Sequence, residues 1–234
     1  MLRHFLPLIV AVAGIQAADF TVTPRLSLGV ATGWGPSQKD IDEEVDDAIN
    51  EGWDNASYEY EINAAINVEI PVLFTIRKAP DAVVGFVAGP AFYYSNNKNS
   101  AVYRVSNLPM NGGQWATVDG DETFQAVGLK GYVGIAFGNG PAHGEVLAWL
   151  GTARMKDKVE GTAAGSGGRL TFSDTDNGTA TLYGIGFGGY VHIGDQKQVQ
   201  LGFRLGYTGG NVTIDSTDIE QSGMLAALEG GISF

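Results

Sequence analysis

The strongest constraint on this chain is a period-two alternation of apolar and polar residues that recurs in eight segments. Segment 57–74 shows it most clearly, because every second residue from Tyr58 to Phe74 is apolar and the residues between include Glu59, Glu61 and Glu69. Successive side chains of a β-strand point to opposite faces, so such a strand is apolar on one face and charged on the other. Glutamates between lipid-facing isoleucines must point into a polar interior. The alternation therefore predicts the strands of a closed barrel in a membrane.

The other seven segments repeat the pattern with different clarity. They cover 20–30, 82–94, 124–137, 144–154, 183–193, 198–208 and 224–234. Segment 82–94 is apolar or small on both faces, with its bulky side chains on the even positions. In 144–154, Leu147 and Trp149 compete with the even positions for the lipid face, and Glu145 favours an inward odd face. Three prolines fall inside predicted strands, where they cannot donate to a ladder, so bulges or strand ends are expected at Pro24, Pro71 and Pro90.

The first 17 residues have the features of a secretory signal peptide. Arg3 is basic, Phe5 to Ile15 is apolar, and Ala17 closes a small-residue cleavage site. The remainder, 18–234, is expected to form a single transmembrane β-barrel domain. It holds no cysteine, so no disulfide or thiolate chemistry contributes. The mean hydropathy of the chain is near zero, as expected when lipid-facing and lumen-facing residues alternate.

Short and long connections alternate between the segments. The three tight turns, rich in Gly, Pro, Asp and Lys, are Thr75–Asp81, Gly138–Ala142 and Gly194–Lys197. The four long connections are 33–56, 95–121, 155–177 and 209–221. Transmembrane barrels have short periplasmic turns and long extracellular loops, so this order orients the chain in the membrane.

This architecture, the signal sequence and the terminal Gly231-Ile232-Ser233-Phe234 resemble the small eight-stranded outer-membrane barrels of the OmpA, OmpX and OmpW-like kind, over the whole mature length. The resemblance implies an all-β fold, an eight-stranded antiparallel up-and-down transmembrane β-barrel in the outer membrane of a double-membraned bacterium. It also implies that Phe234 is a terminal signal for the barrel assembly machinery, with outer-membrane lipid as the other partner. The family often has an aromatic residue where this chain has Ile232. No loop motif supports the resemblance, so it indicates location and fold rather than activity.

The interior of an eight-stranded barrel is just wide enough for side chains to fill. Inward charges therefore need partners, because an isolated buried charge is costly. Counting residues from the periplasmic rim places five inward charges near one level, namely Arg25, Glu69, Lys130, Arg204 and Glu229. We expect these residues to form a charge network that plugs the lumen. A gated conduction path is the alternative.

Histidine placement bears on enzymatic functions. Lipid A deacylases and palmitoyltransferases are barrels of similar appearance that work at the outer leaflet with a histidine-centred site. Here His4 leaves with the predicted signal peptide, His143 sits at a periplasmic turn, and His192 faces inward near the periplasmic end. General-base catalysis without histidine would require a strongly perturbed carboxylate. We expect no catalytic residue, cofactor or metal site, and a lipid-modifying enzyme requires His192 to be reachable from a bilayer leaflet.

The long connections are strongly acidic. They hold 17 of the 26 acidic residues against six basic ones. This is the wrong sign for nucleic acid and suits cations, a basic partner or solubility. In the densest part, Asp40 to Glu51, carboxylates fall at several EF-hand positions, but Val45 replaces the required glycine. A short amphipathic helix capped by Ser37 or Asp40 and ended by Gly52 fits that stretch better.

Three tryptophans lie in or beside the long connections, at Trp34, Trp53 and Trp115. Such residues anchor protein partners or pack loops onto the barrel rim. The sequence thus favours a non-enzymatic outer-membrane barrel with a packed polar lumen and a structural, adhesion or surface-binding role, in which unknown protein or cation contacts involve the loops. The alternative is a narrow channel for small solutes or cations, which acidic loops favour electrostatically.

Overall fold

The computed structural model describes residues 19–107, 113–138, 140–194, 198–215 and 217–234. The predicted signal peptide, with His4, lies outside these ranges. The elements are β1 (Asp19–Ala31), β2 (Gly35–Pro36), α2 (Gln38–Asn50), β3 (Asn55–Glu61), β4 (Ala65–Arg77), β5 (Val84–Ser106), β6 (Trp115–Phe137), β7 (Ala142–Gly165), β8 (Gly168–Ile193), β9 (Val199–Ile214) and β10 (Thr217–Ile232).

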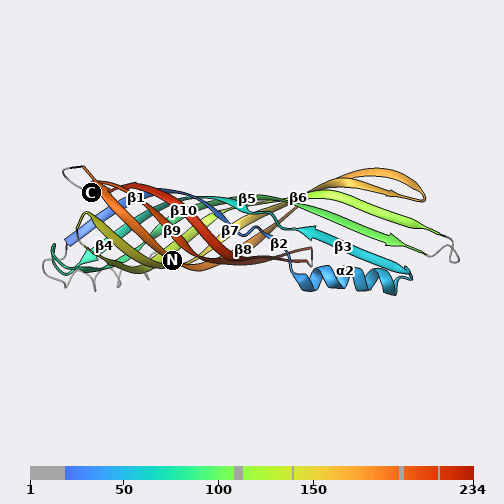
Figure 1. Cartoon of the computed structure of the whole chain (residues 1–234), viewed down its shortest axis with the longest axis horizontal. Helices are drawn as coiled ribbons and strands as arrows, with labels where there is room; N and C mark the ends of the chain where they lie inside the picture. Colours follow the sequence, from blue (N-terminus) through green and yellow to red (C-terminus); the bar gives the residue numbers. More distant parts are fainter. Residues whose placement is uncertain (1–18, 108–112, 139, 195–197, 216) are drawn as a thin grey trace.

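Eight long strands close into an antiparallel ring. The order β1-β4-β5-β6-β7-β8-β9-β10 is completed by pairing between β1 and β10, where Leu28 lies opposite Leu228. The ladder continues to the last residue, because Val22 and Phe234 exchange backbone hydrogen bonds of 3.1 and 3.0 Å. Closure satisfies the backbone groups of both edge strands, which a lipid environment requires. The result is an up-and-down barrel, seen at the left of Figure 1.

The outer face of the ring is apolar, as the alternation predicts. Leu28, Leu129, Ile185 and Leu205, on four different strands, are all about half exposed or more, while their sequence neighbours face inward. On β7, Leu147 and Trp149 are buried and the even positions face outward, which confirms the choice based on Glu145. A closed antiparallel barrel with such an outer face is the form in which strands cross a bacterial outer membrane, and this chain is a transmembrane barrel of that kind. No helix among the described residues is long and apolar enough to span a membrane.

The predicted strand 57–74 is broken into two strands with opposite faces. Glu61 pairs with Ser100 of β5, whereas Ile66 pairs with Asn96, so the register shifts by one residue between them. A one-residue shift turns every side chain beyond it to the other face. Glu59 and Glu61 are therefore exposed on the outside, and the prediction that they face the lumen is wrong. Tyr58, which the alternation places on the apolar outer face, points inward.

The prolines in the strands produce neither bulges nor strand ends. Pro24 pairs with Val72 and Pro71 with Ala91, and the register is the same on both sides of each proline. Instead, the β1–β4 and β4–β5 ladders each skip two residue pairs next to a proline. Proline lacks the backbone N–H donor. The barrel wall therefore loses backbone pairing next to a proline, while the strands keep their register.

Strands rather than irregular loops form most of the extracellular end. β5 and β6 stay paired up to Ser106 and Trp115, and β7 and β8 up to Gly165 and Gly168. This extension projects well beyond the barrel, with α2 lying beside β3 (Figure 1). Apolar alternation stops at the bilayer boundary because no strand face contacts lipid beyond it. The sequence pattern therefore predicts loops where the strands in fact continue. The helix prediction is confirmed, with Ser37 as the N-cap and Gly52 at a positive φ of 99° after the last turn.

Candidate functional site

The lumen of the barrel contains a layer of ion pairs centred on Glu69. Its carboxylate accepts hydrogen bonds from Lys130 Nζ and Arg204 Nη2, both at 2.6 Å. The Tyr132 hydroxyl donates a further hydrogen bond to the same group. Lys130 and Tyr132 come from β6 and Arg204 from β9, both far from β4 in sequence. The side chains of Glu69 and Arg204 are each 2% exposed. Two cations thus share one buried carboxylate.

A second carboxylate joins this cluster to Arg25. Glu229 lies 3.0 Å from Arg204 and 3.7 Å from Arg25, and it accepts a hydrogen bond of 2.6 Å from Tyr190. The structure therefore brings together all five charges that the sequence places in the lumen.

The layer has a sixth charged member, which a count of residues from the rim does not place there. Glu145 accepts two hydrogen bonds from Arg25, at 2.6 and 2.7 Å, although it lies only three residues above the start of β7 at Ala142. Counting residues from the rim puts it too low, because barrel shear staggers neighbouring strands. The sequence does indicate that Glu145 faces inward on β7, and this signal could have placed it in the layer. With Glu145 the layer holds three cations and three carboxylates.

Aromatic rings fill the remaining space around the cations. Lys130 Nζ lies 3.8 Å from the centre of the Tyr93 ring, and the Arg25 guanidinium 4.2 Å from that of Tyr190. Trp149 fits only because β8 carries glycine opposite it: a Cβ on Gly184 would lie 2.3 Å from the Trp149 ring. The inward glycines of β8 are thus packing sites for large lumen side chains.

An apolar layer centred on Trp34 lies above the charges. Trp34 is completely buried and packs with Phe124, Met155 and Leu182 inside the barrel. Its backbone is held by two asparagines of β5: its N–H donates to Asn97 at 3.1 Å, and its carbonyl accepts from Asn97 at 3.0 Å and Asn99 at 2.6 Å. Trp34 is therefore buried inside the barrel and does not rest on the rim.

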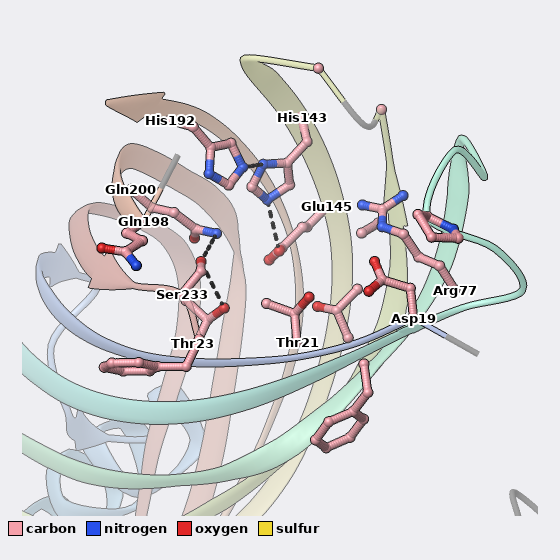
Figure 2. Close-up of a pocket in the computed structure, with 17 residues that line it drawn as sticks. Asp19, Thr21, Thr23, Arg77, His143, Glu145, His192, Gln198, Gln200 and Ser233 are labelled. Atoms are coloured by element: carbon pink, nitrogen blue, oxygen red, sulfur yellow. Dashed lines mark hydrogen bonds and ion pairs between the residues drawn. The ribbon is translucent and has the colours of Figure 1, made fainter. Parts of the chain in front are cut away.

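The periplasmic mouth, by contrast, is an open polar cavity of about 550 Å³. Figure 2 shows His192 beside His143, and His143 pointing at Glu145. The ring nitrogens of the two histidines lie 2.9 Å apart, and His143 Nε2 lies 3.1 Å from the Glu145 carboxylate. Neither histidine is near the extracellular end, so this pair is remote from the outer leaflet. Within the described ranges, no group of three potential ligands is arranged to hold a metal ion.

Above the membrane, two carboxyl groups share the interior of the extension. Asp157 is buried on β7, with Phe124 opposite it on β6 and Asp176 opposite it on β8. Burial, followed by the charge of Glu122, raises the pKa of Asp157 to about 8. Burial also raises the pKa of Glu122. The folded protein thus keeps a proton here that an unfolded chain releases near the ordinary aspartate pKa of 3.8.

We expect this proton to make folding pH-dependent. Between a pH of about 3.8 and about 8 the folded state binds more protons than the unfolded state, so stability falls as pH rises and then levels off. Asp157→Asn removes the titration and should flatten that dependence. Urea unfolding of both proteins in detergent at about pH 5 and about pH 9 tests this. A stability difference between them that is the same at both pH values would contradict it.

Comparisons with known proteins add little to this geometry. No protein-family model matches the sequence, and no curated protein is similar enough to be a relative. One similar solved structure is that of Ail, the attachment invasion locus protein of Yersinia pestis, in complex with the heparin analogue sucrose octasulfate. Ail is 11% identical to this chain, the alignment covers 94% of this chain and 100% of that chain, and the TM-score is 0.33. Neisserial surface protein A is 13% identical to this chain. The alignment covers 93% of this chain and 98% of that chain, with a TM-score of 0.26. Similarities this low do not support a functional assignment. The fold is established by the strand pairing itself.

Proposed function

We propose that this chain is a non-enzymatic outer-membrane protein whose barrel is a closed anchor and whose extracellular extension makes surface contacts, in adhesion or in binding a partner. The observation that supports the proposal is the presence of two packed layers of side chains in the lumen. The buried layer around Glu69 is electrically balanced, and the apolar layer around Trp34 lies directly above it. We expect side chains packed in this way to leave no path for the continuous water that ion conduction requires.

The two ends of the barrel support different roles. The extension rises into the medium with its acidic residues, including Asp119 and Glu160, largely exposed, as suits a contact surface. At the other end, Phe234 closes the ladder with Val22, and the residue is 75% exposed. That exposure is consistent with the proposed role of Phe234 as the signal for the barrel assembly machinery. The His143–His192 pair lies at this end too, away from the outer-leaflet lipids that a lipid-modifying enzyme would need.

Single-channel recording distinguishes a sealed anchor from a narrow channel. Refolded protein in planar bilayers, restricted to preparations whose gel mobility shifts on heating, should show no discrete openings. Arg25→Gln, recorded in parallel, should lower stability without creating conductance, because the Trp34 layer remains. Reproducible cation-selective openings in the unmodified protein, or a large conductance in Arg25→Gln, would establish the channel instead.

A further inference from the structure

A second cavity lies inside the extracellular extension, between α2 and the inner face of the sheet. It has a volume of about 310 Å³, at the small end of the range for ligand pockets. Its apolar and aromatic lining comes from Tyr58, Ala101, Tyr103, Val118, Val159 and Phe172. We call it the α2 cavity. It lies above the Trp34 layer and so faces the medium, separate from the lumen charges.

The register shift before β4 creates the aromatic wall of the α2 cavity. Because β3 is turned by one residue, Tyr58 and Tyr60 point inward instead of toward lipid. The Tyr58 ring stands at 87° to Tyr103 with centroids 6.0 Å apart, and at 81° to Tyr60 with centroids 5.9 Å apart. Asn99 donates a hydrogen bond of 2.7 Å to the Tyr60 hydroxyl, which itself donates to Glu122. Tyr58 and Tyr103 thus form a perpendicular pair beside the cavity, and Tyr60 supports it.

Carboxylates supply the charge of the same cavity. Asp40, Glu44, Asp121 and Glu122 line it, and no lysine or arginine does. Asp40 is engaged in the helix cap with Ser37, and Asp121 pairs with Lys98 at 2.6 Å. That leaves Glu44 and Glu122 without a cation among the described side chains. After burial, these two carboxylates are the next largest cause that raises the pKa of Tyr58, so their negative potential reaches the ring.

We propose that the α2 cavity binds a small organic cation of the quaternary-ammonium class. Perpendicular tyrosine rings attract such a cation through their faces, the unpaired carboxylates neutralise its charge, and the apolar lining accepts its alkyl or aryl groups. The inference rests on the proposed function as a surface-binding barrel and names the ligand chemistry of that surface. Ligands that also carry a phosphate are disfavoured by the acidic lining.

The test uses benzyltrimethylammonium as the probe, titrated into the full-length folded protein in detergent and followed by saturation-transfer NMR. Binding should weaken about tenfold in Tyr58→Leu and persist in Tyr58→Phe, since phenylalanine keeps the ring face. Glu44→Gln should weaken binding several-fold, whereas Glu43→Gln should not. Glu43 offers a matched control because it lies on the same helix and pairs with Lys39 away from the cavity.

Competition experiments with three further compounds make the result decisive. Choline should compete with the probe, its neutral isostere 3,3-dimethylbutan-1-ol should compete far less, and phosphocholine should compete less than choline. Heat-dependent gel mobility shows that each variant is folded. Equal binding to Tyr58→Leu, Glu44→Gln and the unmodified protein, or equal competition by the neutral isostere, would overturn the proposal. That outcome leaves the sealed anchor intact, since the bilayer recordings test it independently.

Discussion

Glu69→Gln should lower the free energy of unfolding by about 3–5 kcal/mol. Glutamine keeps the shape of the side chain but removes the charge that Lys130 and Arg204 share. Both cations would then remain buried. Among the described residues, Glu229 would be the only carboxylate paired with Arg204, and Lys130 would have no ion pair. An uncompensated buried charge is far more costly than the loss of an ion pair in water. Urea unfolding in detergent micelles measures the change.

The matched control is Glu59→Gln. Glu59 also pairs with an arginine, Arg104, at 2.8 Å, but its side chain is 70% exposed. Removal of this pair should change the free energy of unfolding by about 0–1 kcal/mol. If Glu69→Gln costs no more than this control, the lumen layer is hydrated, and the sealed-anchor proposal loses its main support.

Trp34→Ala should be as damaging, by about 3–5 kcal/mol. The substitution removes the largest fully buried side chain of the chain's described part and leaves a void among Phe124, Met155 and Leu182. The surrounding strands belong to a closed ring, so they cannot move inward to fill it. Urea midpoints and heat-dependent gel mobility both report the loss.

Trp115→Ala provides the comparison for Trp34→Ala. Trp115 begins β6 near the tip of the extension and is 48% exposed. Its replacement should change stability by within about 0.5 kcal/mol. Equal effects of the two substitutions would mean that the Trp34 layer contributes nothing special to the barrel.

Several predictions from the sequence depend only on a single strand, and these agree with the structure. The alternation in β6 predicts that Lys130 faces inward, where it is buried. Likewise, Glu145 alone orients β7 correctly, because a buried charge outweighs the small difference between leucine and alanine at the competing positions. The helix over Gln38–Asn50 follows from its cap and its apolar spacing, which are local features as well.

Predictions that depend on how strands meet were less complete. A residue count along one strand does not place Glu145 in the charge layer, because its level depends on shear between strands. The sequence predicts that Trp34 lies in or beside a long connection and meets a partner or packs on the rim. Nothing in the neighbouring residues shows that Asn97 and Asn99, more than 60 residues away, hold its backbone inside the barrel.

The sequence by itself determined that eight strands alternate between lipid and a charged interior, because side-chain direction within a strand has a fixed period of two. Only the tertiary structure decided the one-residue shift between β3 and β4 that turns Tyr58 inward and forms the wall of the α2 cavity. Such a shift leaves the composition and the local pattern unchanged. It is set by hydrogen bonding to β5, a strand that the chain reaches only later, so the pairing between strands decides it.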